Sequence, residues 1–140
     1  MNKNNVNFIG IGAQKAGTSW IFRNLRFLPD FTLLPFKEIH YFDRSLKYRS
    51  SSSLLTESYL VKRIANYSYL KKVKRKVKDE NSLNTINRQT FLWMLRFFSA
   101  HYNDNWYLSL FKKKGITGEF SPSYAMLDKD DIEKMHRLCP

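Results

Sequence analysis

The segment that decides the fold is Gly10-Ile-Gly-Ala-Gln-Lys-Ala-Gly-Thr-Ser19, GIGAQKAGTS in one-letter code. It ends an apolar run, Val6 to Ala13, and leads into the pattern of a helix at Thr18 to Leu28. A glycine-rich loop between a buried strand and a helix N-terminus suits an anion, because backbone N–H groups point outward there. The sequence therefore predicts a strand, an anion-binding loop and a helix, in that order.

This loop matches neither of the common phosphate-binding fingerprints. A dinucleotide-binding loop needs Gly-x-Gly-x-x-Gly, but Lys15 stands three residues after Gly12. A Walker A loop needs a lysine after its last glycine, but Thr18 follows Gly17. The lysine instead lies inside the loop, where its charge would stand beside a bound anion, and the hydroxyls of Thr18 and Ser19 add further donors.

The segments around the loop predict an α/β fold. Phe31 to Leu34 has the composition of a short strand, and Pro35 breaks the chain before an extended segment from Lys37 to Asp43. Ile116 to Tyr124 predicts a strand followed by a turn, in which Pro122 fixes the backbone. This order of strand, loop, helix and strand is typical of an open α/β sheet.

Residues 44–114 predict a helical, basic insertion that covers one side of the sheet. Helical patterning extends over Leu54–Val77, Gln89–Ser99 and Asn105–Lys114, with a polar break at Asp79–Asn84. The apolar residues that repeat at helical spacing in the second of these stretches are Phe91, Leu92, Leu95 and Phe98.

A final helix is predicted near the end of the sequence. Asp128 can cap its N-terminus, and Asp130 and Asp131 fill its first turn. His136 and Arg137 fill its last turn, which suits the helix dipole. The residues expected along its buried edge are Ile132, Met135 and Leu138.

Composition bounds the class of protein. The 140 residues fit one domain, and the single Cys139 excludes an internal disulfide. No apolar run is long enough for a membrane-spanning helix, and we expect a cytoplasmic protein. The net charge is +12, and Ser58 to Lys78 holds eight basic residues and no acidic one. That basic run fits a solvated helix face or flexible excursion, or contact with nucleic acid, an acidic glycan or a membrane surface; charge alone does not choose.

Three segments resemble sulfotransferases that use 3′-phosphoadenylyl sulfate (PAPS). FIGIGAQKAGTSWIFRNL (8–25) resembles their 5′-phosphosulfate-binding loop. KEIHYFD (37–43) resembles the Lys-Glu-x-His-aromatic-Phe-Asp segment of the heparan-sulfate type and its bacterial relatives, and WYLSLFKKKGITGEFSPSYAML (106–127) resembles their later strand and Ser-Pro-x-Tyr turn. The resemblance implies a P-loop-NTPase-like open parallel sheet flanked by helices, with residues 1–140 forming a single, partial sulfotransferase domain.

The resemblance also implies roles for individual residues. Lys15 would stabilise the charge that develops on the leaving nucleotide as PAPS gives up its sulfuryl group, and Trp20 would stack on adenine or pack in the core. The residues implied to bind PAPS are Lys15, Ala16, Gly17, Thr18, Ser19 and Trp20. No metal is expected.

The resemblance of the second segment, residues 37–43, implies that it binds the acceptor and takes its proton. Glu38 would be the general base that takes the proton of an acceptor hydroxyl or amine, and His40 would orient it. In an extended segment these two side chains point the same way. Asp43 would help to position the acceptor. The residues implied to bind the substrate are Lys37, His40, Asp43 and Ser121.

Two departures from the family pattern narrow these expectations. Phe120 stands where relatives often carry a lysine near the acceptor, so the acceptor subsite is expected to differ. The family's Arg-x-Pro turn and downstream serine, which hold the 3′-phosphate, do not occur before Pro140, so we expect a chain truncated before that site. A glycan, a small alcohol, an amine and a lipid-linked sugar all stay open as acceptors.

Two other functions stay open. One is a P-loop nucleotide-binding protein of another class, which is disfavoured because no lysine follows Gly17 and no metal-binding aspartate ends an apolar strand. The other is a non-enzymatic fragment that binds anions or nucleic acid, for which the basic run speaks. No specific nucleic-acid partner is expected.

Overall fold

The computed structural model describes residues 6–49, 57, 59–81, 87–111 and 114–140. Over these residues the chain is a mixed α/β protein in which helices accompany a small parallel sheet, so the predicted α/β class is confirmed. The wider open sheet of a P-loop-like fold stays a prediction. None of the helices in the described part of the chain is long and apolar enough to cross a membrane.

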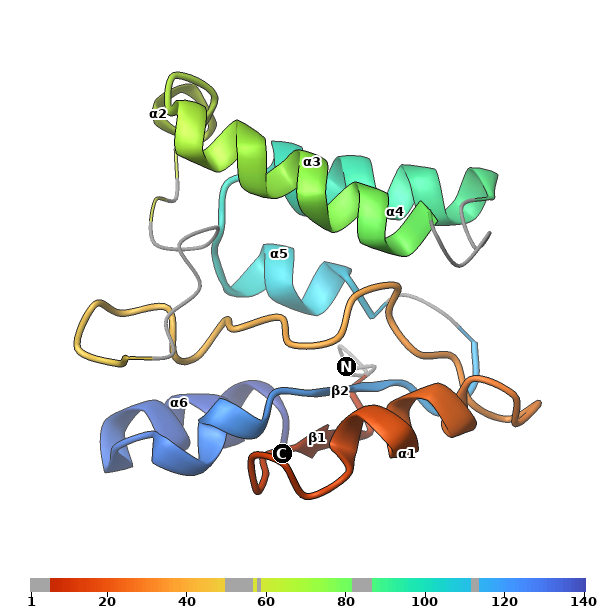
Figure 1. Cartoon of the computed structure of the whole chain (residues 1–140). Coiled ribbons are helices and arrows are strands. Elements are labelled where there is room, and N and C mark those ends of the chain that lie inside the picture. Colours follow the sequence, from red (N-terminus) through yellow and green to blue (C-terminus); the bar gives the residue numbers. More distant parts are fainter. Residues whose placement is uncertain (1–5, 50–56, 58, 82–86, 112–113) are drawn as a thin grey trace.

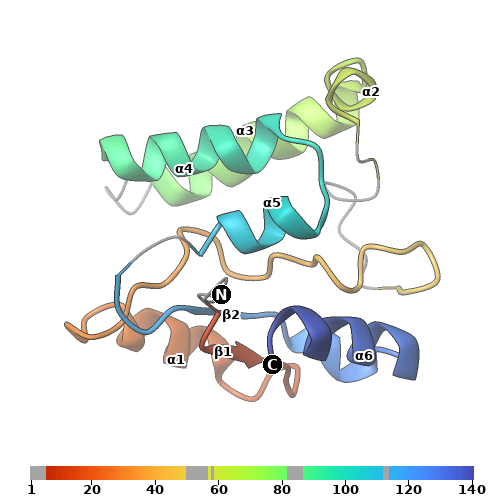
Figure 2. The same cartoon turned by 180° about the vertical axis from the view of Figure 1, so that it is seen from behind.

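The molecule has two halves, which Figures 1 and 2 show from opposite sides. In one half, α3 and α4 run side by side above α5; in the other, α1 and α6 flank the strands. The segment 31–49 crosses between these halves as turns and irregular backbone. The helices of the first half are α2 (Leu60–Ile64), α3 (Tyr67–Asn81), α4 (Arg88–Ser99) and α5 (Asp104–Ser109).

The sheet consists of β1 (Phe8–Gly10) and β2 (Gly118–Phe120), which pair in parallel. The strand predicted at 6–13 is therefore shorter than expected, and of the strand predicted at 31–34 only a single bridge from Phe31 to Ile116 joins the ladder. Gly10 is required by close packing, because a Cβ there would lie 2.3 Å from the ring of Phe120.

Helix α1 (Thr18–Leu25) begins after Gly17, whose backbone is left-handed with φ 77°. It ends three residues before the predicted boundary at Leu28. The apolar residues at i, i+4 and i+7, which are Ile21, Leu25 and Leu28, predict the buried face of this helix, and that prediction was partly wrong: α1 buries Thr18 and Phe22, whereas Ile21 and Leu28 are exposed. The reason is tertiary, because the ring of Phe22 packs edge-on against that of Phe120 at 6.2 Å between centroids.

The helical stretch is broadly as predicted, with different boundaries and a different buried face. The helix expected over 54–77 appears as α2 and α3, while residues 50–56 and 58 lie outside the described residues. Part of the predicted polar break at 79–84 belongs to α3, and α5 is shorter than the helix predicted at 105–114. Helix α4 is confirmed, but it buries Trp93, Met94 and Phe97, while the predicted repeat residues Phe91, Leu92 and Leu95 are about half exposed.

The main core lies between the helical half and the segment 31–49. Its fully buried members are largely aromatic, and their rings meet mostly edge-on, the geometry that aromatic pairs prefer. Fully or almost fully buried members of this core are Leu34, Phe36, Ile39, Tyr41, Phe42, Phe97, Tyr107 and Phe111.

A buried cation joins α2 to this core. Arg63 is 1% exposed and its guanidinium lies 3.7 Å from the ring centroid of Tyr102. The same group donates to the carbonyl oxygens of Phe98 and Ala100, at the C-terminus of α4, where unpaired carbonyls favour a cation.

After β2, a 3₁₀ turn, η1 (Pro122–Met126), leads to α6 (Lys129–Leu138). The predicted cap is confirmed, since the Asp128 side chain accepts from the N–H of Asp131 at 3.1 Å. The predicted edge is confirmed only in part, because Met135 and Leu138 pack on the core whereas Ile132 is exposed.

Candidate active site

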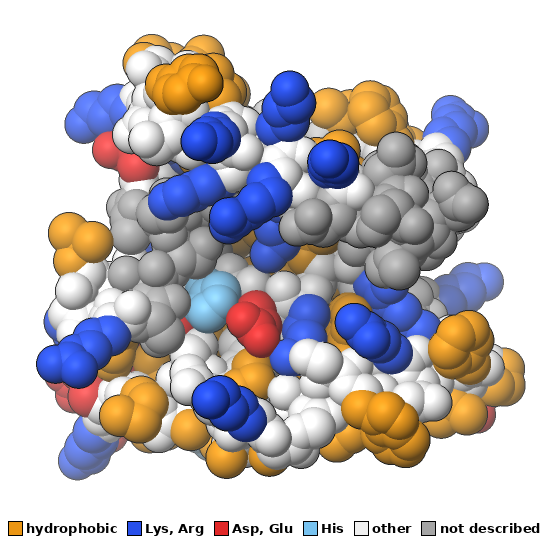
Figure 3. Space-filling view, in the orientation of Figure 1, with side chains coloured by type: hydrophobic (Ala, Val, Ile, Leu, Met, Phe, Trp, Pro, Cys, Tyr) orange, Lys and Arg blue, Asp and Glu red, His pale blue; other side chains and the backbone are white. Residues whose placement is uncertain are grey.

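A pocket of about 640 Å³ opens where the loop before α1 faces the segment after Pro35. Figure 3 shows this face: a histidine and an acidic side chain lie together in the hollow between the two halves, with Lys and Arg side chains around it. The residues that line the pocket are Gln14, Lys15, Gly17, Thr18, Ser19, Lys37, Glu38, His40, Pro122 and Ser123.

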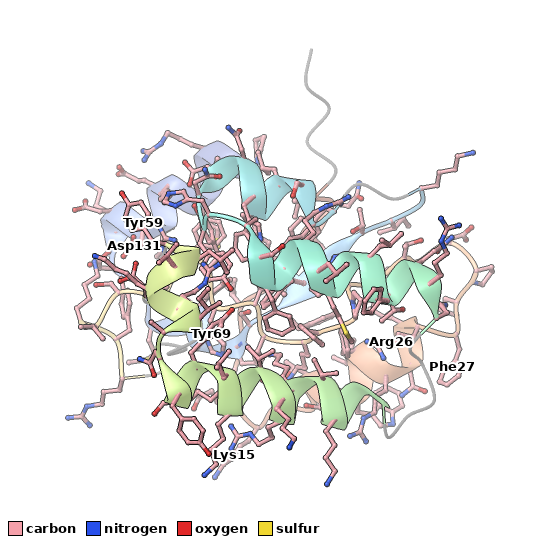
Figure 4. The ribbon with its side chains drawn as sticks, turned by 90° about the horizontal axis from the view of Figure 1, so that it is seen from above. Lys15, Arg26, Phe27, Tyr59, Tyr69 and Asp131 are labelled. Atoms are coloured by element: carbon pink, nitrogen blue, oxygen red, sulfur yellow. The ribbon has the colours of Figure 1, made fainter. Side chains whose placement is uncertain are left out.

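The first wall is the predicted anion loop. Lys15 has a left-handed backbone, φ 60°, and its side chain is exposed. Figure 4, viewed from above, places it at the same edge of the molecule as α3, and Figure 1 shows α3 in the upper half and the loop before α1 in the lower half. Gly17 then starts α1, so the helix N-terminus and the Lys15 ammonium belong to one wall of the pocket.

A second lysine lies at the same helix N-terminus. The Lys37 ammonium donates to Thr18 Oγ1 at 3.1 Å and to Ser19 Oγ at 3.0 Å. It also donates to Glu38 Oε1 at 3.0 Å. Two hydroxyls and a carboxylate therefore hold a cation where the helix dipole by itself favours an anion.

The opposite wall is a chain of charged groups. Asp43 Oδ2 lies 2.8 Å from His40 Nδ1, and His40 Nε2 lies 3.5 Å from Glu38 Oε2. Ser123 Oγ is 3.3 Å from the same Nδ1 atom. His40 thus stands between a buried carboxylate and one that faces the pocket.

These contacts set the charges of the pair. The imidazolium of His40 lowers the pKa of Glu38 to about 2, against the effect of partial burial and with help from the Lys37 ammonium. Burial by itself would lower the pKa of His40, but the carboxylates of Asp43 and Glu38 outweigh it and raise this pKa to about 9. At neutral pH the pocket therefore presents an ionised Glu38 beside a protonated His40.

The backbone of this segment is not extended, so the predicted reason for the meeting of Glu38 and His40 was wrong. Both residues are left-handed, with φ of 61° and 58°. The turn that they make, rather than the alternation of an extended strand, brings their side chains together. Such backbone costs roughly 1–3 kcal/mol per residue and needs support from its surroundings.

That support comes from β2 and the turn after it. The N–H of Glu38 donates to the carbonyl of Phe120 at 3.0 Å, and the N–H of Ile39 donates to Glu119 Oε2 at 3.3 Å. The N–H of Tyr41 donates to Tyr124 Oη at 2.9 Å. Three hydrogen bonds within four residues thus fix the strained segment on the end of the sheet.

Glu119 belongs to this arrangement although it was not among the predicted site residues. It is 1% exposed, and its carboxylate accepts from the hydroxyls of Tyr107 at 2.7 Å, Ser121 at 2.8 Å and Tyr124 at 3.2 Å. Burial raises its pKa, while these hydrogen bonds act in the opposite direction. The available signal was an acidic residue within the strand predicted in the segment 116–124.

The structure brings most of the predicted site residues together. Lys15, Gly17, Thr18, Ser19, Lys37, Glu38 and His40 all line the pocket, as do Gln14 and Ser123, which were not predicted. Ser121 is fully buried under Glu119 and Asp43 is fully buried behind His40, so neither is placed to touch a substrate as predicted. Ser123 occupies the wall position expected of Ser121.

Two of the residues that were predicted to bind PAPS lie outside the pocket wall. Ala16 is exposed in the loop beside it. Trp20 is 70% exposed, which contradicts its packing in the core, while its stacking on adenine stays a prediction. Within the described residues there is no group of three or more His, Cys, Asp or Glu side chains that could hold a metal ion, and the absence of a metal stays a prediction too.

No protein-family model, curated protein or solved structure matches this chain.

Proposed function

We propose that this chain is a PAPS-dependent sulfotransferase that moves a sulfuryl group to an acceptor hydroxyl or amine, and that its sheet belongs to a P-loop-like open sheet. One observation carries the proposal. Among the described residues, those other than glycine with positive φ are Lys15, Glu38 and His40, and all three line one pocket. Strained backbone is concentrated at functional sites, and these are the residues to which the sequence resemblance gives catalytic roles.

The cationic and hydrogen-bond-donating groups of the pocket fit the phosphosulfate of PAPS. Lys15 and Lys37 offer two ammonium groups, and Thr18 and Ser19 offer hydroxyls, all at the N-terminus of α1. Cations, hydroxyls and a helix N-terminus together favour a multiply charged oxyanion. In this proposal Lys37 serves the sulfuryl group, and Lys15 serves the phosphate that leaves.

The reaction requires little covalent chemistry from the protein. A bond forms between the acceptor oxygen or nitrogen and sulfur, while the bond from sulfur to the bridging oxygen of PAPS breaks. Glu38 takes the acceptor's proton, and Lys15 stabilises the negative charge that develops on the leaving phosphate. As in phosphoryl transfer, positioning and charge stabilisation supply most of the rate enhancement.

The low pKa of Glu38 bears on its role as a base. A carboxylate with a pKa of about 2 accepts a proton poorly. An anion bound beside it would raise that pKa, because a nearby like charge disfavours the ionised form. Binding of PAPS therefore makes Glu38 a better base, while His40, which is held by Asp43, keeps the Glu38 carboxylate in place.

The proposal is tested by the response of the melting temperature to nucleotides. PAPS and its product, adenosine 3′,5′-bisphosphate, should raise the melting temperature more than ATP does, and Lys15→Ala should remove that difference. Arg23→Ala is the matched control, because Arg23 is an exposed cation of α1 outside the pocket wall. An equal response to ATP would instead indicate a nucleotide-binding protein of another class, and no response would count against the proposal.

A further inference from the structure

Helix α3 exposes one continuous stripe of side chains. Apart from Ser68, the exposed side chains in the described part of α3 follow helical spacing, at positions i, i+3, i+4, i+7, i+8 and i+11, which places them on one face. They are Tyr67, Leu70, Lys71, Lys74, Arg75 and Lys78. The N-terminal end of this stripe is apolar, and the remainder is cationic.

The apolar end of the stripe continues onto α2. Val61 is 75% exposed and Ile64 is 53% exposed, one helical turn apart, while Tyr67 and Leu70 are 78% and 46% exposed. The buried guanidinium of Arg63 fixes α2 to the end of α4, so the outward position of Val61 and Ile64 is imposed by packing. Figure 3 shows hydrophobic side chains at the top, over α2, next to Lys and Arg side chains along α3.

This surface differs from that of an ordinary solvated helix such as α6. Helix α6 mixes both signs of charge, and Lys129 and Glu133 pair at 3.8 Å. Residues 59–78 instead hold eight basic residues and no acidic one, and the acids Asp79 and Glu80 follow only afterwards. A cationic face beside exposed aliphatic and tyrosine side chains is the pattern of a surface that binds the interface of an anionic membrane.

We propose that α2 and α3 dock on an anionic lipid bilayer, with Val61, Ile64, Tyr67 and Leu70 entering the headgroup region and the cationic part of α3 lying on lipid phosphates. The aliphatic side chains favour a bilayer over nucleic acid, which is bound through phosphate contacts and aromatic stacking and gives Val61 and Ile64 no partner. This inference does not depend on the chemistry of the pocket.

Sedimentation with phosphatidylcholine vesicles, with and without phosphatidylserine, tests the cationic stripe. The protein should bind the phosphatidylserine vesicles, and added salt should weaken that binding. Lys74→Gln and Lys78→Gln should each weaken it about fivefold, and the double variant about 25-fold. Arg88→Gln, which removes an exposed cation at the start of α4, is the matched control and should bind normally.

The apolar end is tested by Val61→Ser combined with Ile64→Ser. This pair should weaken binding about tenfold or more, whereas Phe91→Ser, at a similarly exposed position of α4, should not. Circular dichroism checks that each variant is folded. Equal binding to both kinds of vesicle, or no effect of the α2 pair, would overturn the proposal. So would tighter binding to single-stranded RNA than to vesicles, lost on Lys74→Gln but unaffected by the α2 pair.

Discussion

Glu38 and Glu119 lie on two adjoining segments and show how surroundings separate two identical side chains. Glu38 is partly exposed on the pocket wall, between the cations of Lys37 and His40, and its pKa is lowered to about 2. Glu119 is buried on β2, where hydroxyls and a backbone N–H surround it, and its pKa is raised. One carboxylate is arranged to stay charged on the wall of the pocket, and the other to hold the backbone behind that wall.

The two roles are mechanically linked. The N–H of Ile39, between the left-handed residues Glu38 and His40, is bound by Glu119. The strain of the pocket segment is thus held in part by a side chain that does not reach the pocket. The difference teaches that the geometry of the pocket depends on a residue that does not line it, and three experiments probe that division.

The largest effect is expected from Glu38→Gln. Transfer of labelled sulfate from PAPS to a panel of hydroxyl and amine acceptors should fall by about 10²–10⁴-fold, because the amide cannot take the acceptor's proton. The affinity for PAPS should change little. Glu133→Gln, an exposed acid of α6, is the control for a simple change of charge. Normal turnover by Glu38→Gln would remove it as the base.

A smaller effect, on folding rather than on chemistry, is expected from Glu119→Gln. The amide N–H₂ group places a donor in place of an acceptor where three hydroxyls and an N–H already donate, so the free energy of unfolding in urea should fall by about 1–3 kcal/mol. Tyr107→Phe removes one donor and keeps the carboxylate, so it should cost only about 1 kcal/mol. If Glu119→Gln were as stable as the parent protein while Glu38→Gln unfolded readily, the two roles would have to be exchanged.

The smallest effect concerns pH. Folding raises the pKa of His40 from 6.5 to about 9, so its contribution to stability is complete below pH 6.5 and is lost as the pH rises through 9. The difference in melting temperature between the parent and His40→Gln should therefore be larger at about pH 6 than at about pH 10, by several °C. Glu38, whose pKa is lowered, should lose its contribution in the opposite direction, as the pH falls from about 4.5 to 2.

The sequence predicted the pocket better than it predicted the elements that build it. The residue types in the loop at Lys15 and in the pair Glu38 and His40 predicted a common site, and these residues do line one pocket. The buried face of α4 could not be predicted, because the helix carries apolar side chains on most of its circumference. Packing against Phe36 selects Trp93 and Phe97 as the buried residues. Periodicity carries no information where a helix is apolar all round.

The backbone of the pocket segment could not be predicted either. Lys-Glu-Ile-His does not signal two left-handed residues, because neither is a glycine or an asparagine, and histidine is only moderately enriched in that region. Their conformation comes from Glu119 and Tyr124, which are 80 or more residues away along the chain. The position of Ser123 where Ser121 was expected could not be predicted either, since only the folded turn shows which hydroxyl faces the pocket.

The contact between Lys37 and Glu38 also sets a threshold for whatever enters the pocket. A negative charge already lies against the ammonium, so an incoming anion must displace an internal competitor. A singly charged ion such as chloride that displaces Glu38 only exchanges one single negative charge beside the Lys37 ammonium for another, so it gains little binding free energy. A group with several oxygens and more than one charge can engage Lys15 and Lys37 together and outcompete Glu38. We therefore expect an anion with several oxygens and more than one charge to enter this pocket more readily than chloride does.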